Sequence, residues 1–184
     1  MALKKLLLFL FTGILLGCGT SSKTITPTEQ SKLLDELVLQ KSFQIESDWA
    51  IPLMTNSMNS ISNAGLLPPG SAGNRINLIG NSNFLRVKGD SIMVYLPYYG
   101  ERQMGGGYDS DGGAIQFKGI PEEYEVARDG KRGSYDIRFK MKNKTESFKV
   151  ITTIFPNLSS TILVNSSQRF PIRYSGYMEA IQNE

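Results

Sequence analysis

Residues 97–113 carry the densest set of side chains that could do chemistry. The segment holds three carboxylates, Glu101, Asp109 and Asp111, among six glycines and several aromatic residues. Glycoside hydrolysis needs two carboxylates that flank the scissile bond, so these acids are candidates for it. Clustered Asp oxygens also favour Ca²⁺, although Asp-Ser-Asp-Gly-Gly lacks the full EF-hand spacing and its terminal glutamate. The simplest interpretation is a hairpin loop with solvated acids. We therefore expect no catalytic residue, no metal and no cofactor.

The tyrosines of the same segment suggest a binding site instead of a catalytic one. Tyrosine combines a flat apolar face with a hydroxyl group, so neighbouring rings can stack on a sugar or an apolar ligand. Packing at the rim of a core is the more common role for aromatic residues at a strand end. The possible ligand-binding loop therefore comprises Tyr98, Tyr99, Glu101, Tyr108, Asp109 and Asp111.

The composition excludes most common catalytic machinery. The chain has 184 residues, one cysteine and no histidine. Without histidine it has no Ser-His-Asp or Cys-His pair and no His-ligated zinc. A lone cysteine makes neither an internal disulfide nor a thiolate cage. The length and an apolar content of 40% suit a single globular domain.

The first 17 residues have the pattern of an export signal. A basic start at Lys4 and Lys5 precedes an apolar run that is too short to cross a bilayer as a helix. Leu-Leu-Gly-Cys at residues 15–18 resembles the lipobox of bacterial lipoproteins, which predicts cleavage before Cys18 and acylation of its sulfur. An ordinary signal peptide that happens to contain a cysteine is the alternative. Several acyl chains on Cys18 would anchor the protein firmly to a membrane.

Cleavage would also change the charge. It removes two of the 20 basic residues and none of the 17 acidic ones, so the formal charge falls from +3 to +1. The basic bias belongs to the signal, and we expect no nucleic-acid partner. The segment after Cys18 is small and polar without an acidic cluster. In the bacterial phylum that the resemblance described below implies, this absence favours an outer-membrane protein facing the periplasm. Residues 18–26 are expected to be a flexible tether.

The domain itself, residues 27–184, is expected to begin with one amphipathic helix over 27–41. Thr26 can cap it, Pro27 suits the first turn, and Glu29 can complete a capping box. An apolar stripe for packing against a sheet follows, formed by Leu33, Leu34, Leu37 and Val38.

Beyond this helix the pattern is typical of short antiparallel strands. In residues 135–142, Tyr135, Ile137, Phe139 and Met141 alternate with charged residues, so one face is expected to be buried. Turns are expected at 129–133 and 143–145, and Trp49 is expected in the core with Ile51 and Leu53. The predicted strands are 91–96, 114–117, 135–142, 148–155, 161–164 and 171–174, with 74–79 and 83–88 as further candidates. The fold class is mainly β, an antiparallel meander forming a sandwich or a partly closed barrel.

Several of these segments resemble a known family. The most specific are Leu-Pro-Tyr-Tyr-Gly at residues 96–100 and Tyr-Ser-Gly-Tyr at residues 174–177. Asn83-Phe84-Leu85 and Ile115-Gln116-Phe117 also match. The pattern is similar to domain of unknown function 4251, a family of uncharacterised lipoproteins from the Bacteroidota. The resemblance covers about residues 42–178. It implies a secreted β domain behind a helix and a lipid anchor, and it implies no activity. Asp90-Ser91-Ile92 also resembles the O-glycan acceptor motif of these bacteria, or it is a plain turn into a strand.

These patterns predict an uncharacterised membrane-anchored module of the bacterial cell envelope that is not an enzyme. It would bind an envelope protein, a glycan or a lipid, or have a purely structural role. The alternative is a carboxylate-based hydrolase acting on envelope glycans.

Overall fold

The computed structural model describes residues 27–103 and 113–181. Their strands form one curled antiparallel sheet. Nine strands follow each other in the order β5-β4-β3-β1-β10-β9-β8-β7-β6, and a tenth, β2, pairs only with β1. This confirms the mainly β, antiparallel fold class. The strands are β1 (Ser42–Pro52), β2 (Ile76–Asn77), β3 (Phe84–Lys88), β4 (Ser91–Leu96), β5 (Ile115–Gly119), β6 (Glu123–Asp129), β7 (Ser134–Asn143), β8 (Glu146–Ile154), β9 (Ser159–Ser166) and β10 (Ile172–Ala180).

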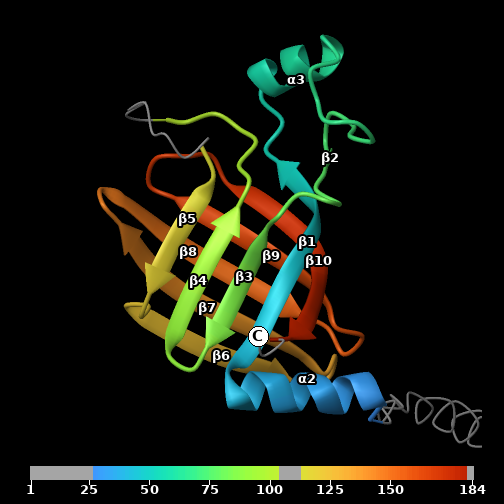
Figure 1. The fold of residues 1–184 in the computed structure, drawn as a ribbon, viewed down its shortest axis with the longest axis vertical. Coiled ribbons are helices and arrows are strands. Elements are labelled where there is room, and N and C mark those ends of the chain that lie inside the picture. The colour runs from blue at the N-terminus through green and yellow to red at the C-terminus, as the bar shows by residue number, and fades with distance from the viewer. Residues whose placement is uncertain (1–26, 104–112, 182–184) are drawn as a thin grey trace, which may run out of the picture.

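The sheet closes on itself only in part and forms a half-barrel. Two meanders, β3–β5 and β6–β10, form its two halves, and Figure 1 shows one in front of the other. The predicted single meander is interrupted because β1 lies between β3 and β10 rather than at an edge. The two halves also meet beside the edge strand β5, where the centre of the Phe117 ring lies 5.2 Å from the centre of the Phe148 ring of β8.

Apolar side chains fill the inside of the curl. In β7, Ile137, Phe139 and Met141 are buried while Arg138 and Lys140 are exposed, as the alternation predicts. The same alternation continues through β4, β8 and β9, so one continuous core lies between the two halves. Burying apolar surface of this kind is the main favourable term in folding.

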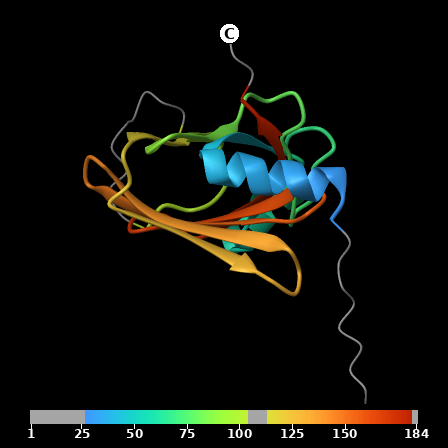
Figure 2. The same ribbon diagram turned by 90° about the horizontal axis from the view of Figure 1, so that it is seen from below.

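Helix α2 (Glu29–Gln40) covers one open end of the half-barrel, and Figure 2 shows it between the two halves. Leu34, Leu37 and Val38 point into the core, whereas Leu33 is partly exposed. The N-cap is Thr28, whose hydroxyl oxygen accepts a hydrogen bond from the Ser31 N–H. The predicted helix therefore exists but begins two residues later than expected. The suggested cap, Thr26, lies outside the described residues.

A bulge in β1 explains why the prediction for Trp49 was wrong. The register with β10 shifts between Ser47 and Trp49, so the buried positions change from Phe43 and Ile45 to Ala50 and Pro52. An extra residue in a strand has this effect because side chains alternate between the two faces. Trp49 is therefore not in the core. It lies half-buried on the outer face under the Arg75 guanidinium, 3.7 Å from its ring centre, and Leu53 is exposed.

Three elements of the fold were not predicted. The first is β1, because no strand was expected at residues 42–52. Helix α3 (Asn56–Asn63), at the end of the molecule opposite α2, is almost entirely polar and buries only Met58. Strand β6 lacks an alternating burial pattern because most of its residues are exposed. Within the described residues, no helix combines the length and apolar character needed to cross a membrane.

Candidate functional site

The loop after β4 lies at the end of the half-barrel opposite α2 (Figure 1) and holds three of the predicted site residues, Tyr98, Tyr99 and Glu101. Tyr98 lies half-buried, with its hydroxyl 2.9 Å from the Glu101 carbonyl and 3.2 Å from the Phe170 carbonyl. Gly100 allows this loop to wrap around the phenol, because a Cβ there would collide with the Tyr98 hydroxyl. Burial raises the pKa of Tyr98, and it also raises the pKa of Tyr99, which packs partly against the core. Both tyrosines thus have the rim-packing role that the sequence favours over a stacking platform.

Glu101 connects this loop to α3. Its carboxylate accepts hydrogen bonds from the side chains of Thr55 and Ser57, at the N-terminus of α3, and from the Ser57 backbone N–H. These bonds, led by the one from Thr55, lower the pKa of Glu101. A carboxyl group with a low pKa stays ionised at neutral pH and is unsuited to act as the acid of glycoside hydrolysis. Its contacts are those of a carboxylate that holds a helix end in place.

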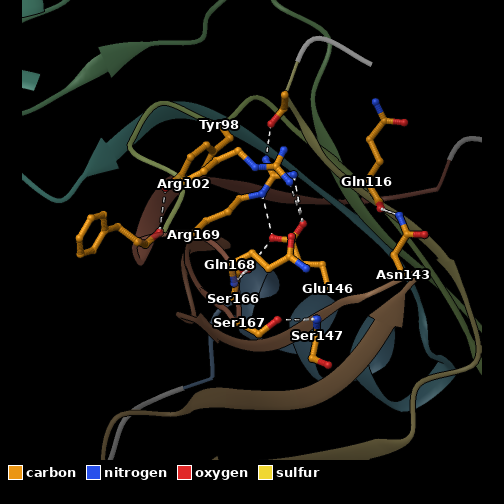
Figure 3. Close-up of polar contacts among 12 residues, drawn as sticks. Tyr98, Arg102, Gln116, Asn143, Glu146, Ser147, Ser166, Ser167, Gln168 and Arg169 are labelled. Carbon is orange, nitrogen blue, oxygen red and sulfur yellow. Dashed lines mark hydrogen bonds and ion pairs between the residues drawn. The ribbon is translucent and has the colours of Figure 1, made fainter. Parts of the chain in front are cut away.

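The polar cluster next to this loop is built on a buried ion pair between Glu146 and Arg169. Arg169 Nε lies 2.8 Å from Glu146 Oε1, and Nη2 lies 3.2 Å from Oε2, so the contact is bidentate (Figure 3). The two side chains are only 6% and 9% exposed. Arg169 also donates to the Gly113 carbonyl and Ser166 donates to Glu146 Oε1. Such a network satisfies the polar atoms that burial would otherwise penalise.

Arg102 is a second cation in the cluster and has few partners. Its Nη2 lies 3.9 Å from Glu146 Oε2, and its Nε is buried without a hydrogen-bond partner among the described residues. The side chain is 24% exposed, and Figure 3 shows it beside Arg169. Two guanidinium groups therefore share one carboxylate. Among the described residues the cluster therefore has more positive than negative charge and an unsatisfied N–H, which are features that an anion would complement.

These groups line a cavity of about 70 Å³. Gln116, Asn143, Lys144 and Gln168 form other parts of its wall, and Asn143 Nδ2 donates to the Gln116 carbonyl over 2.7 Å. Pockets that hold a whole ligand have volumes of roughly 300–1,000 Å³. This cavity therefore has room for a single carboxylate or phosphate group, the groups to which arginine binds in a bidentate manner.

Three segments far apart in the sequence bring the cluster together. Arg102 and Arg169 form an isolated antiparallel bridge, supported by the Gln103 N–H, which donates to the Gln168 carbonyl over 2.7 Å. Glu146 begins β8 on the same face as Phe148 and Val150. None of the three residues was predicted as a site residue, and Glu146 was overlooked because this strand was expected to begin at Phe148. A carboxylate in phase with the apolar positions of a strand is the signal that predicts a buried cation beside it.

The predicted site residues fall into two groups. Cys18, Tyr108, Asp109 and Asp111 lie outside the described residues. Tyr98, Tyr99 and Glu101 are close to the cluster, but Glu101 points toward α3 rather than into the cavity lining. Within residues 27–103 and 113–181, no three His, Cys, Asp or Glu side chains lie together in an arrangement that could hold a metal ion.

The comparisons with known proteins agree with this fold. The family described as domain of unknown function (DUF4251) matches residues 27–178. The chain belongs to the DUF4251 family. A similar structure is the crystal structure of a DUF4251 family protein from Bacteroides eggerthii DSM 20697, which is 14% identical. The alignment covers 82% of this chain and 87% of that chain, with a TM-score of 0.56, so the likeness concerns the fold alone. Comparison with curated proteins gives no match.

The segments that carry the resemblance to DUF4251 hold this fold together. The Tyr174 hydroxyl, on a fully buried side chain, donates over 2.8 Å to the Pro97 carbonyl and so joins the two most specific segments. Gly176 faces the β1 bulge, where any Cβ would collide with the backbone of Glu46 and Ser47. Asn83 closes the same bulge, since its side chain bonds to both the Ser47 N–H and the Ser47 carbonyl at 2.8 and 2.9 Å. The residues that carry the family resemblance therefore stabilise the sheet, whereas the residues of the arginine cluster lie outside these segments.

Proposed function

We propose that this DUF4251 protein is a non-enzymatic binding module whose arginine cavity receives one anionic group of a larger ligand. The observation that carries the proposal is Arg102, which lines the cavity together with Arg169 and Glu146 and whose buried Nε has no hydrogen-bond partner among the described residues. A carboxylate or phosphate oxygen would supply the missing acceptor and balance the second cation. Charge-assisted hydrogen bonds of this kind are the strong ones in binding sites.

The proposed cellular setting comes from the sequence. Cleavage and acylation at Cys18 would anchor the module to a membrane through residues 18–26, and the outer membrane facing the periplasm is the expected location. The ligand would then be an envelope protein, glycan or lipid that carries an anionic group. For the hydrolase alternative, the low pKa of Glu101 and its bonds to α3 give no support.

A calorimetric titration tests the binding proposal with inorganic phosphate and with acetate as probes. We expect saturable binding of at least one probe, and we expect Arg102→Gln to abolish it while the protein keeps its melting temperature within a few degrees. Among the described residues, the Arg102 side chain has only the 3.9 Å contact with Glu146 to lose, so its replacement tests binding rather than folding. Arg132→Gln, at an exposed residue of the β6–β7 turn, is the matched control and should bind like the parent protein. Equal binding by the two variants would contradict the proposal.

A further inference from the structure

A second site lies on the outer face of β7, β8 and β9, away from the core. There the structure has an open groove of about 400 Å³, and its lining is basic and hydroxyl-rich. The residues that matter are Lys140, Lys142, Ser147, Lys149, Asn165 and Ser167. None of them belongs to the arginine cavity. The register of the three strands explains how they come together.

The strand register places two lysines opposite each other. Lys140 of β7 pairs with Lys149 of β8, and Lys149 pairs in turn with Asn165 of β9. One step further along, Lys142 pairs with Ser147. Like charges directly opposite each other on neighbouring strands are destabilising. The sheet therefore keeps a basic cluster at a cost to its own stability.

Acidic neighbours neutralise this cluster only in part. Lys140 Nζ lies 2.8 Å from Glu123 Oε1, and this contact raises the pKa of Lys140. Lys142 and Lys149 form no ion pair with any described residue. Glu122 is the single carboxylate among the residues that line the groove. Because the protein as a whole is close to neutral, this concentration of positive charge on one face gives a local complement to an anionic partner.

The remaining lining indicates what kind of anion fits. Ser147, Ser167 and Asn165 offer hydroxyl and amide groups, which match the hydroxyl groups of sugars. Met141 and Phe148, the apolar residues at the groove, are themselves buried and cannot enter a lipid bilayer. The lysines also line a concave groove, whereas contact with a membrane surface would need them on a protruding surface. These features favour a discrete acidic sugar over a lipid headgroup layer.

We propose that the groove over β7, β8 and β9 binds an acidic oligosaccharide, with Lys142 and Lys149 contacting its carboxylates and Ser147, Asn165 and Ser167 its hydroxyl groups. The site is separate from the arginine cavity, so each can fail without the other. Arg102→Gln should leave this binding unchanged. The ionic contacts are exposed, so binding should weaken as salt is added.

Calorimetry of the full chain with tetragalacturonate, an acidic tetrasaccharide, tests the site against a neutral galactose tetrasaccharide. We expect binding of the acidic sugar only, and the double variant Lys142→Gln/Lys149→Gln should weaken it by about tenfold or more. The matched control is Lys88→Gln/Lys131→Gln, which removes two exposed lysines elsewhere and changes the net charge equally. It should stay within about twofold of the parent protein, because distant surface charges are screened.

Thermal unfolding of the same variants separates binding from folding. Since Lys149 faces Lys140, its replacement should leave the melting temperature unchanged or raise it. Three results would overturn the proposal: equal binding of the neutral sugar, equal loss in both double variants, or no binding of tetragalacturonate together with lysine-dependent binding to phosphatidylglycerol vesicles. The last result would assign the groove to a membrane surface instead.

Discussion

The charge balance around Glu146 determines both the stability and the proposed chemistry of the cavity. Arg169 is nearly fully buried, and its charge is compensated by a bidentate contact with a single carboxylate. Arg102 adds a second charge to the same carboxylate from a distance of 3.9 Å. Removing the carboxylate would leave two cations together, whereas removing Arg102 would leave a balanced pair.

We therefore predict a large loss of stability for Glu146→Gln. The substitution leaves Arg169 as an uncompensated buried charge, which costs about 3–5 kcal/mol in the free energy of unfolding. Urea unfolding followed by circular dichroism measures this loss. Glu123→Gln is the control, because Glu123 forms an exposed pair with Lys140 and its replacement should cost no more than about 1 kcal/mol. Similar losses for the two variants would show that the cluster is not a buried network.

A second prediction at the residue scale concerns alkaline pH. Burial raises the pKa of Tyr124 to about 12, and its hydroxyl has no hydrogen-bond partner among the described residues. A tyrosine with a folded-state pKa above the unfolded value of about 10 favours the folded state fully below pH 10. That contribution is lost as the pH rises from 10 toward 12, because only the unfolded state then releases the proton.

Urea unfolding at pH 9, 10 and 11 tests this in the parent protein and in Tyr124→Phe. The parent protein should lose stability with increasing pH, and the variant should lose less because the other shifted tyrosines remain. At pH 7 the variant should be as stable as the parent protein, since it removes an unsatisfied buried hydroxyl. Parallel curves above pH 10 would mean that Tyr124 does not contribute.

At the scale of elements, the β1 bulge is the feature on which the sheet depends. It joins the two meanders, and Gly176 of β10 leaves space for the backbone of Glu46 and Ser47. Gly176→Ala would place a methyl group where that backbone lies, so β1 and β10 could not keep their register. We expect a loss of stability of at least about 3 kcal/mol, as for other overpacked sites, measured by thermal or urea unfolding.

Gly130→Ala is the control for this substitution. Gly130 lies in the β6–β7 turn with open space around its Cβ position and no left-handed φ. The variant should be within about 0.5 kcal/mol of the parent protein. If Gly176→Ala were equally well tolerated, the close approach of β10 to the bulge would not exist.

Helix α2 gives a further prediction at this scale, because it connects the two halves of the sheet. Asp35 binds Arg128 and Tyr135 on the β6–β7 side at 3.0 and 2.8 Å, and Lys41 binds Asp90 in the β3–β4 turn at 2.8 Å. The two ion pairs, Asp35–Arg128 and Lys41–Asp90, are exposed and contribute little. The packing of Leu34 into the core should therefore dominate the contribution of the helix.

Leu34→Ala should lower the free energy of unfolding by about 2–5 kcal/mol, because it leaves a cavity under α2. Leu39→Ala is the matched control on the same helix, since Leu39 is 86% exposed. Chemical denaturation should show a change of less than about 0.5 kcal/mol for the control. Comparable effects at both positions would indicate that α2 does not seal the core.

At the scale of the whole molecule, the sequence predicts the regular strands well and the site poorly. Alternation in β4 and β7 depends on neighbours within one strand, so it is visible locally. The bulge in β1 is not, because it depends on Gly176 and Asn83, which are distant in sequence. The prediction for Trp49 failed for this reason. The cavity could not be predicted as a unit, since it joins Arg102, Glu146 and Arg169 from three segments far apart in the sequence.

The proposed membrane attachment is a second claim about the whole molecule that can be tested. If Cys18 is acylated, Cys18→Ala should move the protein from the membrane fraction to the soluble fraction, as immunoblotting of fractionated cells would show. Cys18→Ser should behave in the same way, because a hydroxyl does not replace the thiol in this modification. Retention of both variants in the membrane fraction would contradict the proposed anchor.

The most direct test of the proposed binding function observes the Arg102 Nε–H group itself. In a nitrogen–proton NMR spectrum, stepwise addition of inorganic phosphate or acetate should shift the Arg102 Nε–H signal to saturation. The Arg86 Nε–H signal serves as an internal reference. It should not shift, because this group already donates a hydrogen bond to Gln44 Oε1 over 2.8 Å. A saturable shift of Arg102 without a shift of Arg86 is the predicted result. An Arg102 signal that does not respond to either anion would contradict a binding role for the cavity.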